Sequence, residues 1–159
     1  MGDAEEHSFE VTGKVGLWES SKPDSGWHYL AIKGQTAMES LLQKDPGINV
    51  VYSINEPSGF GGANALKAAG KDPKDFILVS VDGGCDAIKR GIKTGVIDAT
   101  SQQYPQNMAA QGVKTIAEAA RGGKKPSGYT DTGVNLISAD PAKGVTSKDA
   151  AYGTANCWG

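Results

Sequence analysis

Short apolar segments alternate along this chain with longer segments of helical periodicity. Residues 48–54 and 76–81 are nearly continuous apolar runs, which is typical of strands covered on both faces. Residues 60–69 between them have helical character and end at Gly70, a common residue at helix carboxyl ends. Strands are predicted at residues 9–17, 48–54, 76–81, 97–101 and 134–137, and helices from Asp24 or Ser25 to residue 44 and at residues 60–69, 86–93 and 106–121.

The first predicted helix has an apolar stripe at helical spacing and stops at Asp45 and Pro46. The stripe consists of Leu30, Gly34, Ala37, Met38, Leu41 and Leu42. Strands that alternate with helices at this spacing indicate βαβ units and therefore an α/β fold with a parallel sheet.

Length and composition predict one folded domain. The chain has 159 residues, of which 38% are hydrophobic and 21% charged, which is enough apolar material for a sizeable core. We expect a loose leader at residues 1–8, a single lobe at residues 9–139 and a tail of low periodicity at residues 140–159.

Composition also excludes several partners. The formal net charge is -2 and no basic cluster is interleaved with aromatic residues, so no nucleic-acid partner is expected. No apolar run approaches the ~18 residues of a membrane-spanning helix, so we expect no membrane insertion, and the first residues lack the pattern of a secretory signal. No His or Cys pair has zinc-ligand spacing, and neither a metal nor a cofactor is predicted.

Polar residues follow the predicted strands, at the sheet edge where ligands of open α/β folds bind. This set includes Trp18, Asn55, Glu56, Asp82 and Gln103. Carboxylates and amides can bridge the neighbouring hydroxyls of a sugar, and an aromatic ring offers a flat face to its C–H groups. Each residue also has a purely structural interpretation, such as helix capping by Asn55 or Asp82, a backbone contact of Gln103, or burial of Trp18 in the core. As a set at successive strand ends, they favour a ligand site.

Catalytic alternatives have weaker support. Glu56 and Asp82 are a possible acid and base pair for glycoside hydrolysis, although capping or solvated carboxylates are commoner. Neither His7 nor His28 has a visible partner, and no Walker-type phosphate loop or dinucleotide fingerprint is present. We therefore expect a binding protein and not an enzyme. The two cysteines, Cys85 and Cys157, are either separate buried thiols or one disulfide that holds the tail.

Four motifs in order resemble the second lobe of periplasmic sugar-binding proteins of the ribose-binding type. They are INVVYSINEP at 48–57, ALKAAG at 65–70, ILVSVDGG at 77–84 and ATSQQYP at 99–105. Residues 131–137 resemble the final strand of that lobe, and residues 147–159 are similar to the tail of the fructose-type branch. Residues 16–29 depart from the family pattern and border the predicted site.

The resemblance implies a three-layer α-β-α sandwich with a mainly parallel five-stranded sheet, of the flavodoxin-like, type I periplasmic-binding-protein kind. It implies that Asn55, Asp82 and Gln103 bind a monosaccharide of the fructose or ribose type. It also implies an exported, periplasmic or extracellular setting, which favours a Cys85–Cys157 disulfide. The implied partners are an absent amino-terminal lobe or a second copy, and the permease of an ABC transporter for the full-length parent.

Other functions stay open at this point. The fold also serves as the effector-sensing lobe of sugar-responsive regulators, although no helix-turn-helix is visible. A flavodoxin-like electron carrier would bind flavin, and a ligand-free single lobe would bind nothing.

Overall fold

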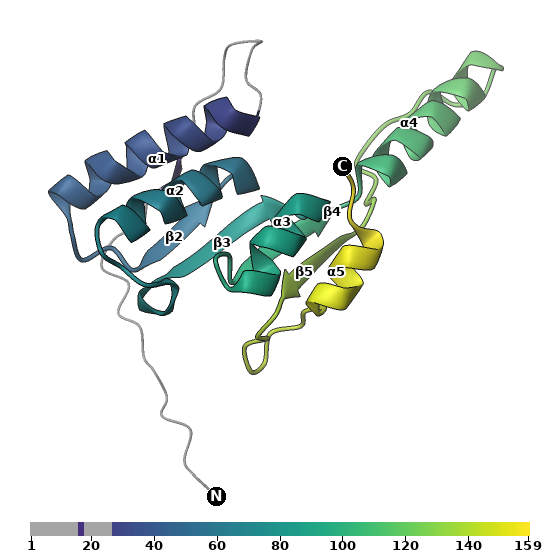
Figure 1. Cartoon of the computed structure of the whole chain (residues 1–159). Coiled ribbons are helices and arrows are strands. Elements are labelled where there is room, and N and C mark those ends of the chain that lie inside the picture. Colours follow the sequence, from purple (N-terminus) through teal and green to yellow (C-terminus); the bar gives the residue numbers. More distant parts are fainter. Residues whose placement is uncertain (1–15, 18–26) are drawn as a thin grey trace, which may run out of the picture.

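The computed structural model describes residues 16–17 and 27–159, which form an α/β domain around a twisted sheet (Figure 1). The strand order in the sheet is β1-β2-β3-β4-β5; the first four strands are parallel and β5 is antiparallel to β4. The bounds are β1 Gly16–Leu17, β2 Val50–Ser53, β3 Ile77–Asp82, β4 Ala99–Gln103 and β5 Val134–Ser138. The predicted α/β class and the mainly parallel five-stranded sheet are confirmed. Of the strand expected at residues 9–17, only Gly16–Leu17 belongs to the described residues, and the expected leader at 1–8 lies outside them.

The helices lie close to their predicted positions. They are α1 Trp27–Lys44, α2 Glu56–Ala68, α3 Cys85–Arg90, α4 Pro105–Ala120 and α5 Ala150–Asn156, with short 3-10 turns at Pro73–Asp75 and Ile92–Thr94. Helix α2 begins four residues before the predicted start at residue 60, because Asn55 caps it and Pro57 occupies the first turn, where the missing N–H costs nothing. Helix α5 was not predicted, since the tail carries too few apolar positions to show a period.

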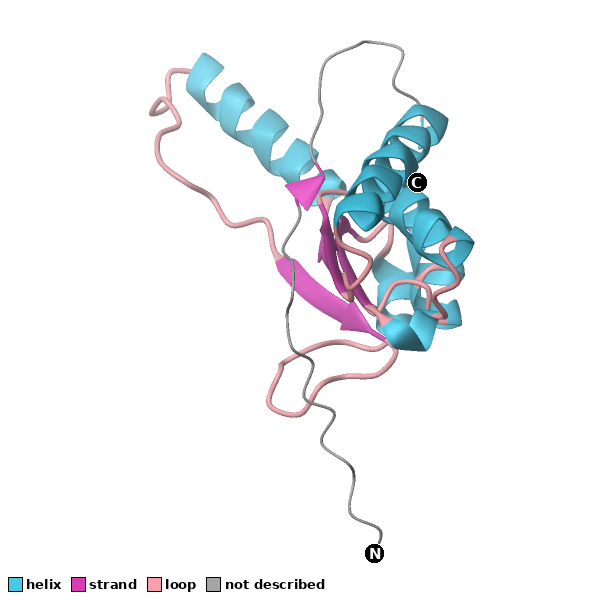
Figure 2. Cartoon of the chain, turned by 90° about the vertical axis from the view of Figure 1, so that its left-hand side faces the viewer, coloured by secondary structure: helices cyan, strands magenta, loops and turns pink. Residues whose placement is uncertain are grey.

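The sequential strand order places the crossover helices on one face of the sheet. Parallel crossovers are right-handed, so a chain that always adds its next strand on the same side must leave every connecting helix on the same face. Helices α1, α2 and α3 obey this rule (Figures 1 and 2). Figure 2 shows α4 on the other side, pointing away from the sheet. Two helical layers were expected. In the described residues, α1, α2 and α3 form one of them, and α4 alone lies on the other side of the sheet.

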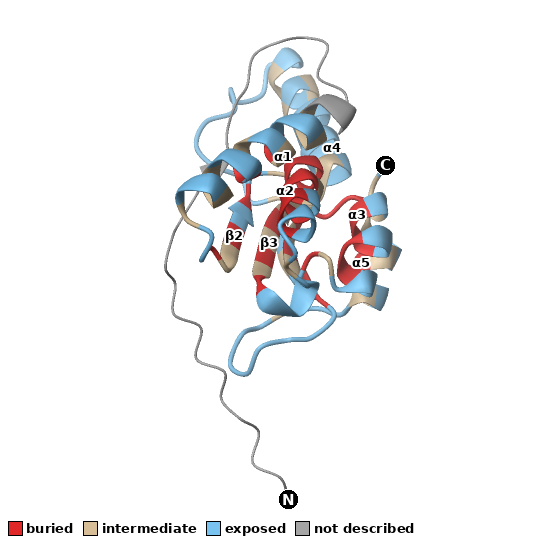
Figure 3. Cartoon of the chain, turned by 60° about the vertical axis from the view of Figure 1, so that its left-hand side comes forward, coloured by how far each residue is buried: buried red, intermediate tan, exposed pale blue. Residues whose placement is uncertain are grey.

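The hydrophobic core lies between the sheet and the α1–α2–α3 layer, where Figure 3 shows the buried residues concentrated. Alternate residues of β2, β3 and β4 point into it, and the predicted stripe of α1 contributes Gly34 and Met38. The largest fully buried apolar side chains are Met38, Leu66, Leu78, Ile88, Ile92, Ile97 and Ile137.

Among the described residues, the opposite sheet face is only partly covered, and helix α4 contributes no buried residue. Tyr52 and Ile54 on or beside β2 are 51% and 40% exposed, and no residue of α4 is buried. Val113 and Ile116 of α4 are 70% and 67% exposed. Parallel sheets are normally covered on both faces, so this surface has the character of an interface.

Helices α1 and α2 approach each other so closely that only glycine fits between them. A Cβ atom on Gly61 would overlap the carbonyl oxygen of Ala31, and one on Gly34 would overlap the carbonyl oxygen of Ser58. The neighbouring Gly62 is different, because nothing lies within 4 Å of the position its Cβ would occupy. The α1–α2 contact therefore depends on Gly34 and Gly61 and not on glycine in general.

We predict that Gly61→Ala lowers the free energy of unfolding by about 1–3 kcal/mol, because backbone must move apart to admit the methyl group. Gly62→Ala is the matched control on the same helix. It should raise stability by about 0.5–1 kcal/mol through helix propensity alone. Urea unfolding followed by circular dichroism measures both, and equal effects of the two substitutions would contradict the close-contact account.

Candidate functional site

Three neighbouring strands end at one edge of the sheet with the polar residues that the sequence singled out. Tyr52 of β2 pairs with Val79 of β3, a register that places Asn55, just after β2, at the level of Asp82, the last residue of β3. Asp82 in turn pairs with Gln102 of β4, next to Gln103. The prediction that these strand ends share one edge is therefore confirmed.

Asn55 combines a structural role with a free donor. Its side-chain oxygen accepts a hydrogen bond from the backbone N–H of Ser58 at 3.0 Å, which caps α2. The capping interpretation is thus correct. The residue is half-buried, and its amide nitrogen has no partner among the described residues, so it can still donate to a ligand.

Asp82 and Gln103 form a direct side-chain pair at this edge. The Gln103 amide nitrogen donates to Asp82 Oδ1 at 2.7 Å, so Gln103 does not make the backbone contact considered from sequence. Burial raises the pKa of Asp82, and the hydrogen bond from Gln103 opposes that rise. Asp82 also has a φ of 116°, a left-handed conformation that non-glycine residues adopt at a cost and that often marks a functional position. A second carboxylate oxygen of Asp82 and the Gln103 carbonyl stay available to a ligand.

Glu56 holds the loop that carries Asp82. Its carboxylate accepts hydrogen bonds from the backbone N–H groups of Gly83 and Gly84, at 2.5 and 3.4 Å, and from the Thr100 hydroxyl at 2.8 Å. Burial raises its pKa to about 7, with a smaller rise from Asp82, although the hydrogen bonds from Thr100 and the glycine amides lower it. Glu56 therefore joins α2, the β3–α3 loop and β4.

This arrangement corrects the prediction that Glu56 contacts the ligand. The residue is 1% exposed and both of its carboxylate oxygens already accept hydrogen bonds from the protein, so no ligand reaches it in this structure. The helix capping considered for Asp82 is not observed, because α3 begins after Gly84 without a side-chain cap hydrogen bond. The other predicted contact, Trp18, lies outside the described residues.

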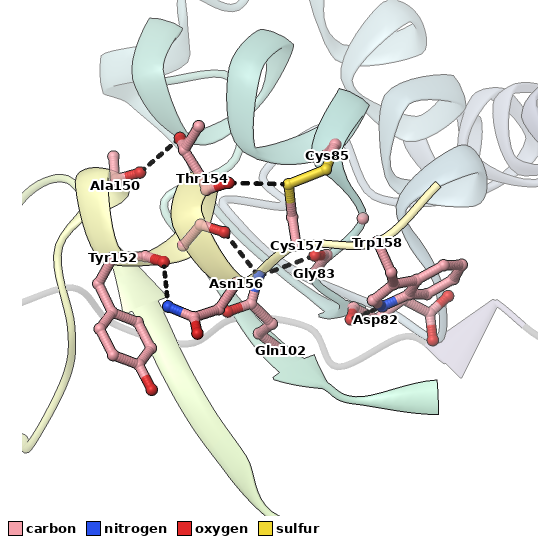
Figure 4. Close-up of a disulfide and its surroundings, with 12 residues drawn as sticks. Asp82, Gly83, Cys85, Gln102, Ala150, Tyr152, Thr154, Asn156, Cys157 and Trp158 are labelled. Carbon is pink, nitrogen blue, oxygen red and sulfur yellow. Dashed lines mark hydrogen bonds between the residues drawn. A yellow bond between two sulfur atoms is a disulfide. The ribbon is translucent and has the colours of Figure 1, made fainter. Parts of the chain in front are cut away.

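The tail closes over the same edge through the predicted disulfide, Cys85–Cys157, which joins positions 72 residues apart (Figure 4). Buried Gln102 adds a second tie, because its amide nitrogen donates to the carbonyl oxygens of Gly83 at 2.9 Å and Gly153 at 3.0 Å. The Trp158 indole N–H donates to the backbone oxygen of Asp82 at 3.2 Å.

Trp158 and Gln102 were missing from the predicted site. Gln102 lies at a predicted strand end, but only the fold shows that it faces inward and bridges the tail to the β3–α3 loop. Trp158 follows Cys157 directly, and once Cys157 is paired with Cys85, residue 158 must lie near Asp82. That pairing was the available signal.

Other kinds of site are not evident in the part of the chain that the structure describes. No group of three or more His, Cys, Asp and Glu side chains there has the arrangement of a metal site. None of the helices described is both long enough and apolar enough to cross a membrane.

Comparison with known proteins identifies the family of this fold. Residues 21–125 match the model of the periplasmic binding protein domain. The chain is 33% identical over 98 residues to the ribose import binding protein of Escherichia coli (strain K12), covering 62% of this chain and 32% of the relative. It is 33% identical over 117 residues to the D-allose-binding periplasmic protein of the same organism, covering 74% of this chain and 36% of the relative.

Solved structures give the same result. The crystal structure of a galactofuranose binding protein matches with a TM-score of 0.60 and 30% identity, over 67% of this chain and 36% of that chain. The binding protein of the arabinose ABC transporter from Shewanella sp. ANA-3, bound to L-arabinofuranose, matches with a TM-score of 0.56 and 30% identity, over 62% of this chain and 33% of that chain. The chain thus spans about a third of the length of the relatives it matches. These relatives are solute-binding proteins, in agreement with the prediction that the chain is not an enzyme.

We predict that Glu56 makes the protein less stable as the pH rises from about 4.5 to about 7. The folded state keeps the Glu56 proton over this range whereas the unfolded state loses it, so stability is greatest below the unfolded pKa and falls through the folded one. The effect is on the order of 3 kcal/mol at full ionisation. It is measured as the difference in unfolding free energy between wild type and Glu56→Gln at each pH.

Glu39→Gln, on the exposed side of α1, is the control and should leave the wild-type pH profile in place. A Glu56→Gln profile that parallels that of wild type would mean that Glu56 does not titrate in this window.

Proposed function

Because this chain belongs to the periplasmic binding protein family, we propose that it is the carboxy-terminal sugar-binding lobe of such a protein, and that it binds a monosaccharide at the edge formed by Asn55, Asp82 and Gln103. The observation that carries the proposal is the hydrogen bond from the Gln103 amide nitrogen to Asp82 Oδ1 at 2.7 Å. The buried Glu56 holds the loop that follows Asp82. The lobe binds and releases its ligand unchanged.

The chemistry of this edge suits vicinal hydroxyl groups. The free oxygen of Asp82 accepts from one hydroxyl, and a charged acceptor makes the stronger kind of hydrogen bond. The Gln103 carbonyl accepts from a second hydroxyl, and the Asn55 amide nitrogen donates to a third. Because Glu56 fixes the loop after Asp82 through the amides of Gly83 and Gly84, these groups need little reordering when a sugar binds.

The named ligands of the relatives support a neutral sugar. Their names give ribose, D-allose and galactofuranose, which are all neutral monosaccharides. The edge offers the carboxylate of Asp82 and the side-chain amides of Asn55 and Gln103, which suit an uncharged polyhydroxylated molecule better than an anion. Fructose- or ribose-type sugars are therefore the proposed ligands.

A second lobe that completes the binding site is part of the proposal. We propose that the complete protein encloses its sugar between this lobe and a second one, so that this lobe makes about half of the contacts. If two lobes together bind with a Kd of ~1 μM, or about 8 kcal/mol, half of that free energy corresponds to a Kd near 1 mM. We propose that an amino-terminal lobe or a second copy completes the site, that the complete protein delivers sugar to an ABC permease, and that it works in the periplasm, where a disulfide persists.

Calorimetric titration with D-ribose, D-allose, D-fructose and D-galactose tests this function. We predict a Kd near 1 mM for at least one sugar. Asp82→Ala should weaken binding by at least tenfold, because it removes a charged acceptor. Asp86→Ala is the matched control, since Asp86 is an exposed carboxylate four residues away that forms an ion pair with Arg90.

Asn55→Ser separates the helix-capping role of Asn55 from its proposed role in sugar binding. Serine keeps a capping oxygen, so the protein should stay folded, but it lacks the amide donor and should bind several-fold more weakly. Sugar binding that is equal in wild type, Asp82→Ala and Asn55→Ser would reject the proposed site. A cooperatively folded wild type that releases no heat with any of these sugars would reject the function.

A further inference from the structure

We infer that Trp158 is a ligand-contacting residue, whose indole forms an aromatic wall beside Asp82 and is held there by the Cys85–Cys157 disulfide. The inference rests on the proposed function and adds to the strand-end residues a contact from the far end of the chain. It gives the disulfide a role in binding as well as in stability.

Three anchors fix Trp158 at the edge of the sheet. Its neighbour Cys157 is bonded covalently to Cys85 at the start of α3. Its backbone oxygen accepts a hydrogen bond from the Cys85 N–H at 3.0 Å, and its indole N–H donates to the backbone oxygen of Asp82 at 3.2 Å. Figure 4 shows the indole directly beside Asp82 as a result.

The indole also borders an open space. Trp158 is only half-buried, and it lines a pocket of about 300 Å³ between the start of α4 and the end of α5. Tyr104 and Tyr152 are further aromatic residues of this lining, and Gln106, Asn107 and Asn156 supply amides. None of Asn55, Asp82 and Gln103 is among the lining residues, so this pocket shows that part of the indole is accessible and does not itself mark the proposed sugar-binding edge.

The roles of the two ends of the indole are distinct. The N–H is already bonded to the protein, so the ring can offer a ligand only its apolar surface. That surface lies beside the residue whose carboxylate accepts sugar hydroxyls, and a sugar presents hydroxyls at its rim and C–H groups on its faces. An aromatic ring fixed in advance adds contact area without a large ordering cost.

The test compares D-ribose affinity across variants of the full, oxidised chain by calorimetry. Trp158→Ala should raise the Kd about three- to tenfold, the range expected for one aromatic contact. Trp158→Phe keeps a ring but lacks the N–H donor, and it should stay within about twofold of wild type if the ring surface makes the contact. Tyr129→Ala, which removes an aromatic residue that is 91% exposed, should leave the Kd unchanged.

The disulfide is tested by the double variant Cys85→Ser/Cys157→Ser. Freed from its covalent anchor, Trp158 should lose much of its contribution, so the Kd should rise to near that of Trp158→Ala. Adding Trp158→Ala to the double variant should then cost little more, because the two changes remove the same contact.

Each result separates this inference from the proposed function. If wild type binds ribose and Trp158→Ala binds equally well, the inference is wrong and the proposed function stands. If Trp158→Ala and Trp158→Phe weaken binding equally, Trp158 acts through its hydrogen bond to the backbone of Asp82. The inference that its ring surface contacts the ligand is then wrong. An unchanged Kd in the double variant overturns the role of the disulfide. If a folded wild type binds none of the four sugars tested above, the proposed function fails and the inference fails with it.

Discussion

The buried carboxylate of Glu56 ties three segments of this domain together at one edge of the sheet. It accepts from the amides of Gly83 and Gly84 in the β3–α3 loop and from Thr100 of β4, although it belongs to the first turn of α2. Burial of a carboxyl group is costly unless its oxygens are bonded. Here the amides of Gly83 and Gly84 bond them, which fixes the position of the β3–α3 loop. Asp82, which precedes this loop, has a φ of 116°. The candidate binding edge therefore depends on a residue that no ligand touches.

A second constraint comes from the tail. Gln102 bonds the β3–α3 loop and α5 together, and the disulfide adds a covalent tie between α3 and residue 157. By chain entropy, closing a loop of 72 residues stabilises the fold by about 4 kcal/mol. The loop that carries Asp82 is thus held by Glu56 from the side of α2 and by Gln102 and Trp158 from the side of the tail. Such double support is what a preorganised binding site needs.

The sequence predicts the α/β class, the strands from residue 48 onward, and the gathering of Asn55, Asp82 and Gln103 at one edge, because these follow from local apolar patterns and from the rule that parallel strands share a carboxyl edge. It does not show that Glu56 faces inward, since a charged residue after a strand is more often solvated. It misses α5 and Trp158 because their positions depend on pairs of residues far apart in the chain. The placement of α1, α2 and α3 on one face depends on strand order, which no local pattern reports.

The central claim is that sugar binds at the carboxyl edge of β2, β3 and β4. An amide chemical-shift map of the isotopically labelled chain, recorded during a titration with D-ribose, tests it most directly. The account predicts that the largest shifts fall on Asn55, on residues 82–84 and on Gln103, and that all of them saturate with one Kd near 1 mM. Shifts confined to α4 or to the open face of the sheet, with the β3–α3 loop unmoved, would contradict it.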